Sequence, residues 1–229
     1  MKGEFVAVVS HELRTPVTAL IGYAKTLRQP EFADDPLMRQ EFLERMERQG
    51  DRLLRLVENL LTTSKLESDQ LKVSVGRVLF EDLVREVVEG LAGEADRVFL
   101  DVPTDLPVLH TDRQLLGRVV TNVLDNALKY SPDGSPVELG ARADGDEVTF
   151  WVRDHGIGIT PEQERRIFER FYQADSSTTR KFRGAGLGLS MVRDLLGHLG
   201  GAIEVQSLPG TGSTFTIRLP VKVEAGRPA

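Results

Sequence analysis

The sequence contains no cysteine, and this absence excludes disulfide bonds, thiolate metal sites and cysteine-dependent catalysis. It has no apolar run as long as a membrane span, and Met1-Lys2-Gly3 leads into an amphipathic pattern instead of a signal peptide. Basic residues are outnumbered, with 29 against 35 acidic, whereas a general nucleic-acid binder needs a basic surface. We therefore expect a soluble, cytoplasmic chain that contacts neither nucleic acid nor membrane.

A short stretch near the N-terminus, Ser10-His11-Glu12-Leu13-Arg14-Thr15-Pro16, places a histidine, an acid and a hydroxyl within about one helical turn. Apolar residues recur around it at helical spacing, so His11 should lie on the flank of a helix and remain accessible. Thr15 shares that face, and Glu12 reaches the imidazole obliquely. A carboxylate that holds one ring proton leaves the other nitrogen free to attack. Pro16 should kink the helix one turn beyond the histidine. The alternative is an exposed helix histidine followed by an ordinary proline kink.

Residues 4–29 and 37–66 predict two long helices, separated by a segment with two prolines and two aspartates. The second helix has an apolar seam at spacings of three and four residues, formed by Leu43, Met46, Gly50, Leu53, Val57 and Leu60. A hairpin with so broad an apolar face cannot bury it alone. We expect two α-helical hairpins to pair as a dimeric four-helix bundle; the alternative is a monomer that packs this face on its own second domain.

The periodicity changes near residue 69, where a second domain of α+β type should begin. Helices are expected at 80–91 and at 111–130. A third should begin at residue 160, and a fourth should follow the glycine-rich stretch and end at about residue 199. The pattern Thr111-Asp112-Arg113-Gln114 predicts a capping box at the start of the 111–130 helix. Ile167, Phe168 and Phe171 would form the apolar stripe of the third. Strands are expected at 71–75, 98–102, 136–143, 147–153, 202–206 and 214–219. The chain should fray after Pro220.

The predicted 111–130 helix carries a polar stripe on a face away from its apolar side. Asn122 and Asn126 stand four residues apart, and Lys129 follows three later. Magnesium favours oxygen ligands and is commonly shared with substrate phosphates, and the lysine would add a positive charge for those phosphates. The stripe therefore indicates a metal and phosphate site, with a solvated helix face as the alternative.

Asp154, at the end of a predicted strand, is followed by Gly156 and Gly158. This arrangement offers a fixed acceptor for the exocyclic amine of adenine beside backbone that a flat ligand can approach. Residues 173–183 are polar and indicate a mobile lid or a surface loop. The glycine-rich stretch 184–190 then opens a helix whose N–H groups can cradle a triphosphate. It is neither a Walker loop nor the dinucleotide fingerprint.

Five stretches together resemble the sequence boxes of sensor histidine kinases, in the same order and with similar spacing. They are the histidine stretch 11–16, then 122–129, Asp154-His155-Gly156-Ile157-Gly158, Ile167-Phe168-Glu169-Arg170-Phe171 and 184–189. The resemblance implies a dimerisation and histidine-phosphotransfer domain at 1–68. It implies a catalytic ATP-binding domain at 69–222, an α+β sandwich of the gyrase and Hsp90 type with a mixed sheet and helices on one face. We expect residues 223–229 to form a frayed tail, as chain termini commonly do.

The resemblance also implies a role for each matching residue. His11 would accept the γ-phosphoryl group of ATP with Glu12 as acid–base partner, and Thr15 would position a water for phosphatase activity. Asn126 would ligate Mg²⁺, and Asp154 would select adenine. The other residues implied to bind ATP are Asn122, Lys129, Tyr130, Gly156, Gly158, Phe171, Gly184, Gly186, Leu187, Gly188 and Leu189.

The implied partners are a second copy of the chain, paired through the hairpin, and the receiver domain of a response regulator, whose aspartate would take the phosphoryl group. A longer parent protein could be anchored in the inner membrane through an N-terminal part. Two residues depart from the family pattern: His155 stands where asparagine is usual, and Gln173 where many members have arginine. The alternative functions are a non-kinase ATPase and a catalytically silent dimeric ATP-binding module.

Overall fold

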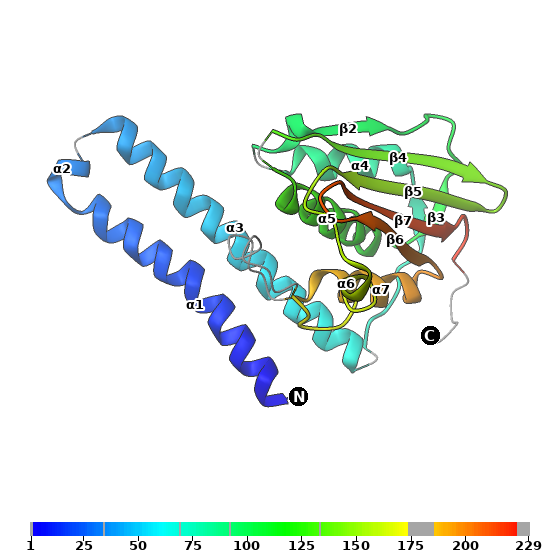
Figure 1. Cartoon of the computed structure of the whole chain (residues 1–229), viewed down its shortest axis with the longest axis horizontal. Helices are drawn as coiled ribbons and strands as arrows, with labels where there is room; N and C mark the ends of the chain where they lie inside the picture. The colour runs from blue at the N-terminus through cyan, green and yellow to red at the C-terminus, as the bar shows by residue number, and fades with distance from the viewer. Residues whose placement is uncertain are drawn as a thin grey trace. The chain divides into compact units, whose positions relative to one another are not determined.

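The computed structural model describes residues 2–33, 35–68, 70–91, 93–132, 134–173 and 186–223. The chain divides into two compact units, Met1–Gln70 and Leu71–Ala229 (Figure 1). Among the described residues, no helix combines the length and the apolar character needed to cross a membrane.

The first unit is a hairpin of two long helices, α1 (Lys2–Leu27) and α3 (Pro36–Glu67), joined through the short helix α2 (Pro30–Ala33). The segment predicted as a plain break thus contains a turn of helix, because proline is well suited to the first position of a helix. Asp35 begins α3 by accepting hydrogen bonds from the N–H groups of Leu37 and Met38 at 2.9 and 3.2 Å. The hairpin itself is as predicted.

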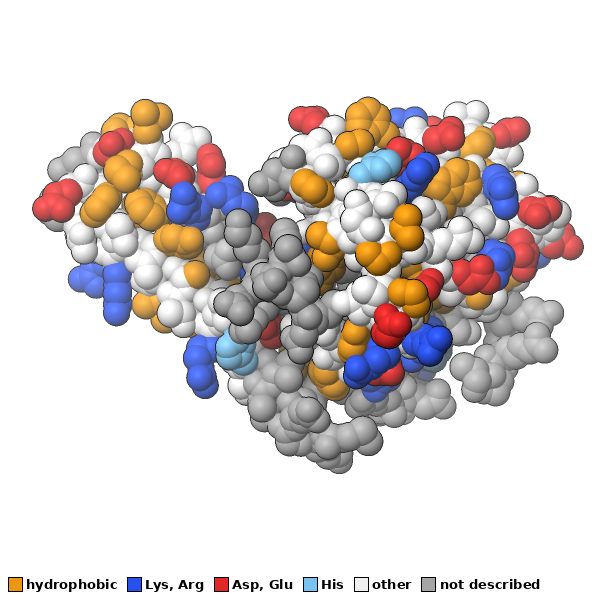
Figure 2. Space-filling view, in the orientation of Figure 1, with side chains coloured by type: hydrophobic (Ala, Val, Ile, Leu, Met, Phe, Trp, Pro, Cys, Tyr) orange, Lys and Arg blue, Asp and Glu red, His pale blue; other side chains and the backbone are white. Residues whose placement is uncertain are grey.

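Large apolar side chains along this hairpin remain exposed within a single chain, and Figure 2 shows several of them as separate orange areas. Leu54 and Leu61 are both 58% exposed. The others on α1 and α3 are Val17, Ile21, Leu37, Leu43 and Val57. So much exposed apolar surface on one element is typical of an interface.

The second unit is built on a five-stranded mixed sheet of order β2-β4-β5-β7-β6. Its strands are β2 (Val98–Asp101), β4 (Val137–Asp144), β5 (Glu147–Asp154), β6 (Ala202–Leu208) and β7 (Gly212–Pro220). β2 runs parallel to β4, and the other neighbours are antiparallel. A second sheet pairs β1 (Gly76–Val78) with β3 (Leu109–Thr111).

Helices α4 (Phe80–Glu89), α5 (Arg113–Tyr130) and α7 (Gly188–His198) cover one face of the five-stranded sheet (Figure 1). Alternate residues of β5, among them Phe150 and Val152, are buried against these helices, and the ring of Phe80 lies 4.9 Å from that of Phe150. On the opposite face Trp151 lies over Gly140, where a side chain would overlap the indole. The predicted sandwich, with a mixed sheet and helices on one face, is confirmed.

Two predicted features of the early part of this unit are wrong. Residues 71–75 form no strand, although their apolar residues alternate, because a strand needs a partner and β3 pairs only with 76–78. β3 itself was not predicted. Thr111 belongs to β3, so the N-cap of α5 is Asp112, whose Oδ1 accepts from the N–H groups of Gln114 and Leu115. The Thr111 capping box is therefore absent.

Two later predictions also need correction. The helix that opens at Thr160 with a capping box is only α6 (Pro161–Glu164), so Ile167, Phe168 and Phe171 lie in the turns beyond it. The chain does not fray directly after Pro220, because the N–H of Val221 donates to Asp146 O at 2.8 Å and the N–H of Val223 donates to His110 O at 3.0 Å. Residues 224–229 lie outside the described residues.

Candidate active site

His11 lies on the exposed flank of α1, where 61% of its side chain is accessible. Its Nδ1 is 3.7 Å from Oε1 of Glu12, so the oblique approach expected for adjacent helix positions brings the carboxylate within ion-pair distance. Thr15 is exposed and donates its hydroxyl to the carbonyl of His11 at 3.2 Å. α1 continues through Pro16 without ending. The imidazole is accessible to an incoming electrophile and has an acid beside one ring nitrogen.

Glu12 is the most buried of these groups, with only 10% of its side chain exposed. Its second oxygen, Oε2, lies 3.8 Å from a guanidinium nitrogen of Arg52, which comes from α3. Sequence reasoning missed Arg52, because it is one of several arginines on α3 and no local pattern pairs it with α1. Glu12 therefore has the histidine at one oxygen and an arginine from the opposite helix at the other.

Asp154 ends β5 in a buried position, with 5% of the residue exposed. Its Oδ1 accepts hydrogen bonds from the backbone N–H of Gly156 at 2.8 Å and of Ser213 at 3.3 Å. Burial raises the pKa of Asp154, and these hydrogen bonds oppose the shift. Both backbone contacts use Oδ1, and the side chain of Ser213 also hydrogen-bonds the carboxylate. The neighbouring His155 turns outward to pair with Glu138 at 3.3 Å.

The two glycines after Asp154 are required by contacts within the chain. A side chain on Gly156 would overlap the carbonyl of Tyr130, and one on Gly158, whose φ is 66°, would overlap the carbonyl of Leu208. The N–H of Ile157 also donates to Tyr130 O at 3.3 Å. This loop is therefore packed between the end of α5 and the end of β6, a close approach that only glycine allows.

The polar stripe of α5 faces the start of α7. A Cβ on Gly188 would lie 3.2 Å from Oδ1 of Asn122 and 3.8 Å from Nδ2 of Asn126. Among the described residues, the N-cap residue of the 11-residue helix α7, Leu187, makes no side-chain cap hydrogen bond. The first N–H groups of an α-helix have no partner within the helix and suit an anion. The ammonium of Lys129 lies 4.8 Å from the centre of the Tyr130 ring.

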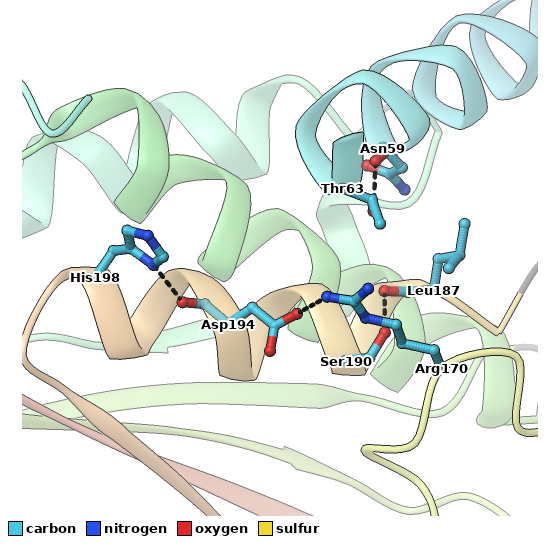
Figure 3. Close-up of polar contacts among 7 residues, drawn as sticks. All are labelled: Asn59, Thr63, Arg170, Leu187, Ser190, Asp194 and His198. Carbon is cyan, nitrogen blue, oxygen red and sulfur yellow. Dashed lines mark hydrogen bonds and ion pairs between the residues drawn. The ribbon is translucent and has the colours of Figure 1, made fainter. Parts of the chain in front are cut away.

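The predicted stretches 167–171 and 184–189 contact each other through Phe171 and Gly186. The N–H of Phe171 donates to Gly186 O at 2.9 Å, and both residues have positive φ, 66° and 65°. Arg170 reaches across to Asp194 on α7 at 2.9 Å, as Figure 3 shows. This pair was not predicted. Gly184 and most of the predicted lid at 173–183 lie outside the described residues.

Figure 3 also shows two hydrogen-bond contacts of Ser190 and His198 at the ends of α7. The hydroxyl of Ser190 donates to Leu187 O at 3.0 Å, which tightens the first turn of the helix, and a ring nitrogen of His198 lies 3.0 Å from Asp194 O. On α3, Thr63 donates to Asn59 O within its own helix.

No cluster of three or more acidic or histidine side chains suited to a metal occurs in the described part of the chain.

Comparison with known proteins gives a consistent result. The family model described as His Kinase A (phospho-acceptor) domain matches residues 1–69, and that described as Histidine kinase-, DNA gyrase B-, and HSP90-like ATPase matches residues 111–223. The sensor-like histidine kinase SenX3 of Mycobacterium tuberculosis (strain ATCC 25618 / H37Rv) is 38% identical over 225 residues. That match covers 97% of this chain and 54% of the relative, so the chain spans about half of its length.

Solved structures agree. Full-length ShkA in complex with AMPPNP is 33% identical with a TM-score of 0.67, over 97% of this chain and 47% of that one. The Acinetobacter baumannii histidine kinase AdeS is 26% identical with a TM-score of 0.65, over 92% of this chain and 98% of that one. The two family models match successive parts of this one chain, and both solved structures match it over more than nine tenths of its length. The chain therefore belongs to the sensor histidine kinases of two-component systems and carries their catalytic core.

Proposed function

We propose that this chain is an ATP-dependent protein-histidine kinase, which phosphorylates itself on His11 and passes the group to an aspartate on the receiver domain of a response regulator. The observation that carries this proposal is the accessible imidazole of His11 with Nδ1 3.7 Å from a carboxylate. A proton held at Nδ1 leaves Nε2 as the nucleophile. Residues 1–68 would form the dimerisation and phosphotransfer domain and 69–222 the ATP-binding domain.

In the proposed ATP site, Oδ2 of Asp154 accepts a hydrogen bond from the amine of adenine, and the N-terminus of α7 meets the phosphates. The amide oxygen of Asn126 would ligate Mg²⁺, which shares its coordination with phosphates and neutralises their charge. A single protein ligand suits this role, because magnesium usually keeps several waters and binds substrate phosphates as well. The other proposed contacts are Asn122, Lys129, Tyr130, Gly156, Gly158, Phe171, Gly184, Gly186, Leu187, Gly188 and Leu189.

We also propose that the chain works as a homodimer through the hairpin, because the exposed apolar side chains of α1 and α3 need a partner. We infer that this core works in the cytoplasm, where ATP is available, and that a longer parent protein would attach it to a sensor part or a membrane anchor. Thr15, one turn after His11, would position the water for phosphatase activity toward the phosphorylated receiver.

The kinase proposal is tested by incubating the purified chain with γ-labelled ATP and magnesium. Wild type should take up label that is acid-labile and alkali-stable, as expected for a phosphohistidine, and His11→Gln and Asn126→Ala should not. His198→Gln is the matched control, because this histidine lies at the end of α7, where its ring nitrogen contacts a carbonyl of its own helix. Label that persists in His11→Gln, or that resists acid, would contradict the proposal.

A further inference from the structure

The carboxylate of Glu12 bridges two partners that come from different helices. Oε1 faces His11 on α1, and Oε2 faces Arg52 on α3, at 3.7 and 3.8 Å. Only 10% of the Glu12 side chain is exposed, whereas 46% of Arg52 and 61% of His11 remain accessible. An acid so poorly solvated needs a positive charge near it, and removing that charge leaves the acid uncompensated.

Arg52 contacts an acid on the other helix, whereas two arginines that precede it on α3 contact acids on their own helix. Arg45 pairs with Glu41 and Arg48 with Glu44, each one turn earlier on the same helix. Such pairs between neighbouring turns are a common surface feature of small energetic value. Arg52 instead reaches the acid that lies beside His11 on the other helix. The position of the Glu12 carboxylate therefore depends on a side chain of α3.

We propose that Arg52 is a positioning residue for phosphoryl transfer at His11, an inference that rests on the proposed kinase function. It holds the Glu12 carboxylate with Oε1 toward Nδ1, so that the neutral imidazole of His11 keeps its proton on Nδ1 and presents Nε2. Arg52 itself neither gives nor takes a proton. Its role is to keep one ring tautomer in place.

The chemical step balances without any further reactant. The Nε2 lone pair forms a bond to the γ-phosphorus of ATP, the bond from that phosphorus to the bridging oxygen breaks, and ADP leaves. The positive charge that develops on the ring lies beside Glu12. The Nδ1 proton then passes to the Glu12 carboxylate and from there to water, which leaves phosphohistidine with an uncharged ring and a negatively charged phosphoryl group.

The kinetic test compares Arg52→Gln and Arg52→Lys with Arg48→Gln, the matched control one turn earlier on α3. Arg52→Gln should lower kcat for autophosphorylation about tenfold and leave KM for ATP within about twofold, since no ATP contact is removed. Arg52→Lys keeps the charge and should restore most of the rate. Arg48→Gln should match wild type. In a Glu12→Gln background, Arg52→Gln should have no further effect, because the acid through which it acts is gone.

A spectroscopic test is independent of kinase activity. Nitrogen-15 NMR of the His11 ring should show the Nδ1–H tautomer as the main neutral form in wild type and in Arg48→Gln, and a mixture in Arg52→Gln. Equal tautomer populations in wild type and Arg52→Gln, or a kcat loss that persists in the Glu12→Gln background, would overturn the inference. Absence of label in wild type would refute the kinase proposal instead, and the tautomer populations would still decide the role of Arg52.

Discussion

Replacing Asp154 by asparagine should weaken ATP binding without weakening the fold. The side-chain oxygen Oδ1 already accepts two backbone N–H groups, from Gly156 and Ser213. The amide oxygen of asparagine would keep those bonds, so its NH₂ group would take the position of Oδ2 and face the donor amine of adenine. The substitution removes one hydrogen bond to a charged acceptor, worth about 1.5–3 kcal/mol, and opposes two donors. We expect ATP affinity to fall about 10- to 100-fold.

The same substitution, Asp154→Asn, should lower ATP affinity but should not lower the free energy of unfolding. Burial raises the pKa of Asp154, so the folded state binds this proton more tightly than the unfolded chain does. The stabilisation from protonated Asp154 is complete below the unfolded pKa and is lost as pH rises through the folded pKa. At pH 7 the wild type therefore carries an unfavourable buried charge that Asp154→Asn lacks. The variant should have an equal or larger free energy of unfolding at pH 7, and its advantage should shrink in acid.

Calorimetric titration with ATP and urea unfolding at pH 7 and at pH 4 would measure both effects. Asp144→Asn is the matched control, because Asp144 is exposed at the opposite end of β4 and should change neither quantity. Two results would refute the reasoning. One is ATP affinity within twofold of wild type in Asp154→Asn, and the other is a variant that unfolds more easily than wild type at pH 7.

Three further substitutions test the packing, the metal and the dimer. Gly158→Ala should lower the free energy of unfolding, measured in urea, by about 3 kcal/mol or more, because it adds a clash with Leu208 to an unfavourable φ. Gly145→Ala is the control: its φ is 61° but the space around it is open, so it should cost only about 1 kcal/mol. Asn126→Ala should abolish the gain in ATP affinity that magnesium gives over EDTA, as titration in both buffers would show; an unchanged gain would exclude it as a ligand. Leu61→Lys should convert a dimer to monomers in sedimentation equilibrium, since burying a leucine contributes about 1.5–3 kcal/mol from each chain; an intact dimer would place the interface elsewhere.

The sequence predicts the elements of this fold whose periodicity is long. The hairpin helices, α5 and the strands β4 to β7 carry apolar residues at helical or alternating spacing over most of their length, so their patterns identify them. The errors are local. The alternation at 71–75 lacks a partner strand, and the three-residue strand β3 is too short to show a period. Strand pairing is set by tertiary contacts that no single stretch of sequence contains.

The site divides in the same way. Proximity of His11 to Glu12 and the position of Asp154 at a strand end follow from local spacing. The Arg52 contact does not, because it depends on the register between two helices, and many registers would place some arginine near α1. The Arg170–Asp194 pair likewise joins residues 24 positions apart through a turn with positive φ. The roles proposed for the site residues remain predictions.

The hydrogen bond from Phe171 to Gly186 has a consequence for how this family can vary in length. It joins the two ends of the segment between those residues, and the pair Arg170–Asp194 supports the same junction. These two contacts between described residues thus help to hold the two ends together. Doubling the length of such a loop costs only about 0.6 kcal/mol in closure entropy. Insertions and deletions after Gln173 should thus be tolerated by the fold, and homologues can be expected to differ most in length at this point.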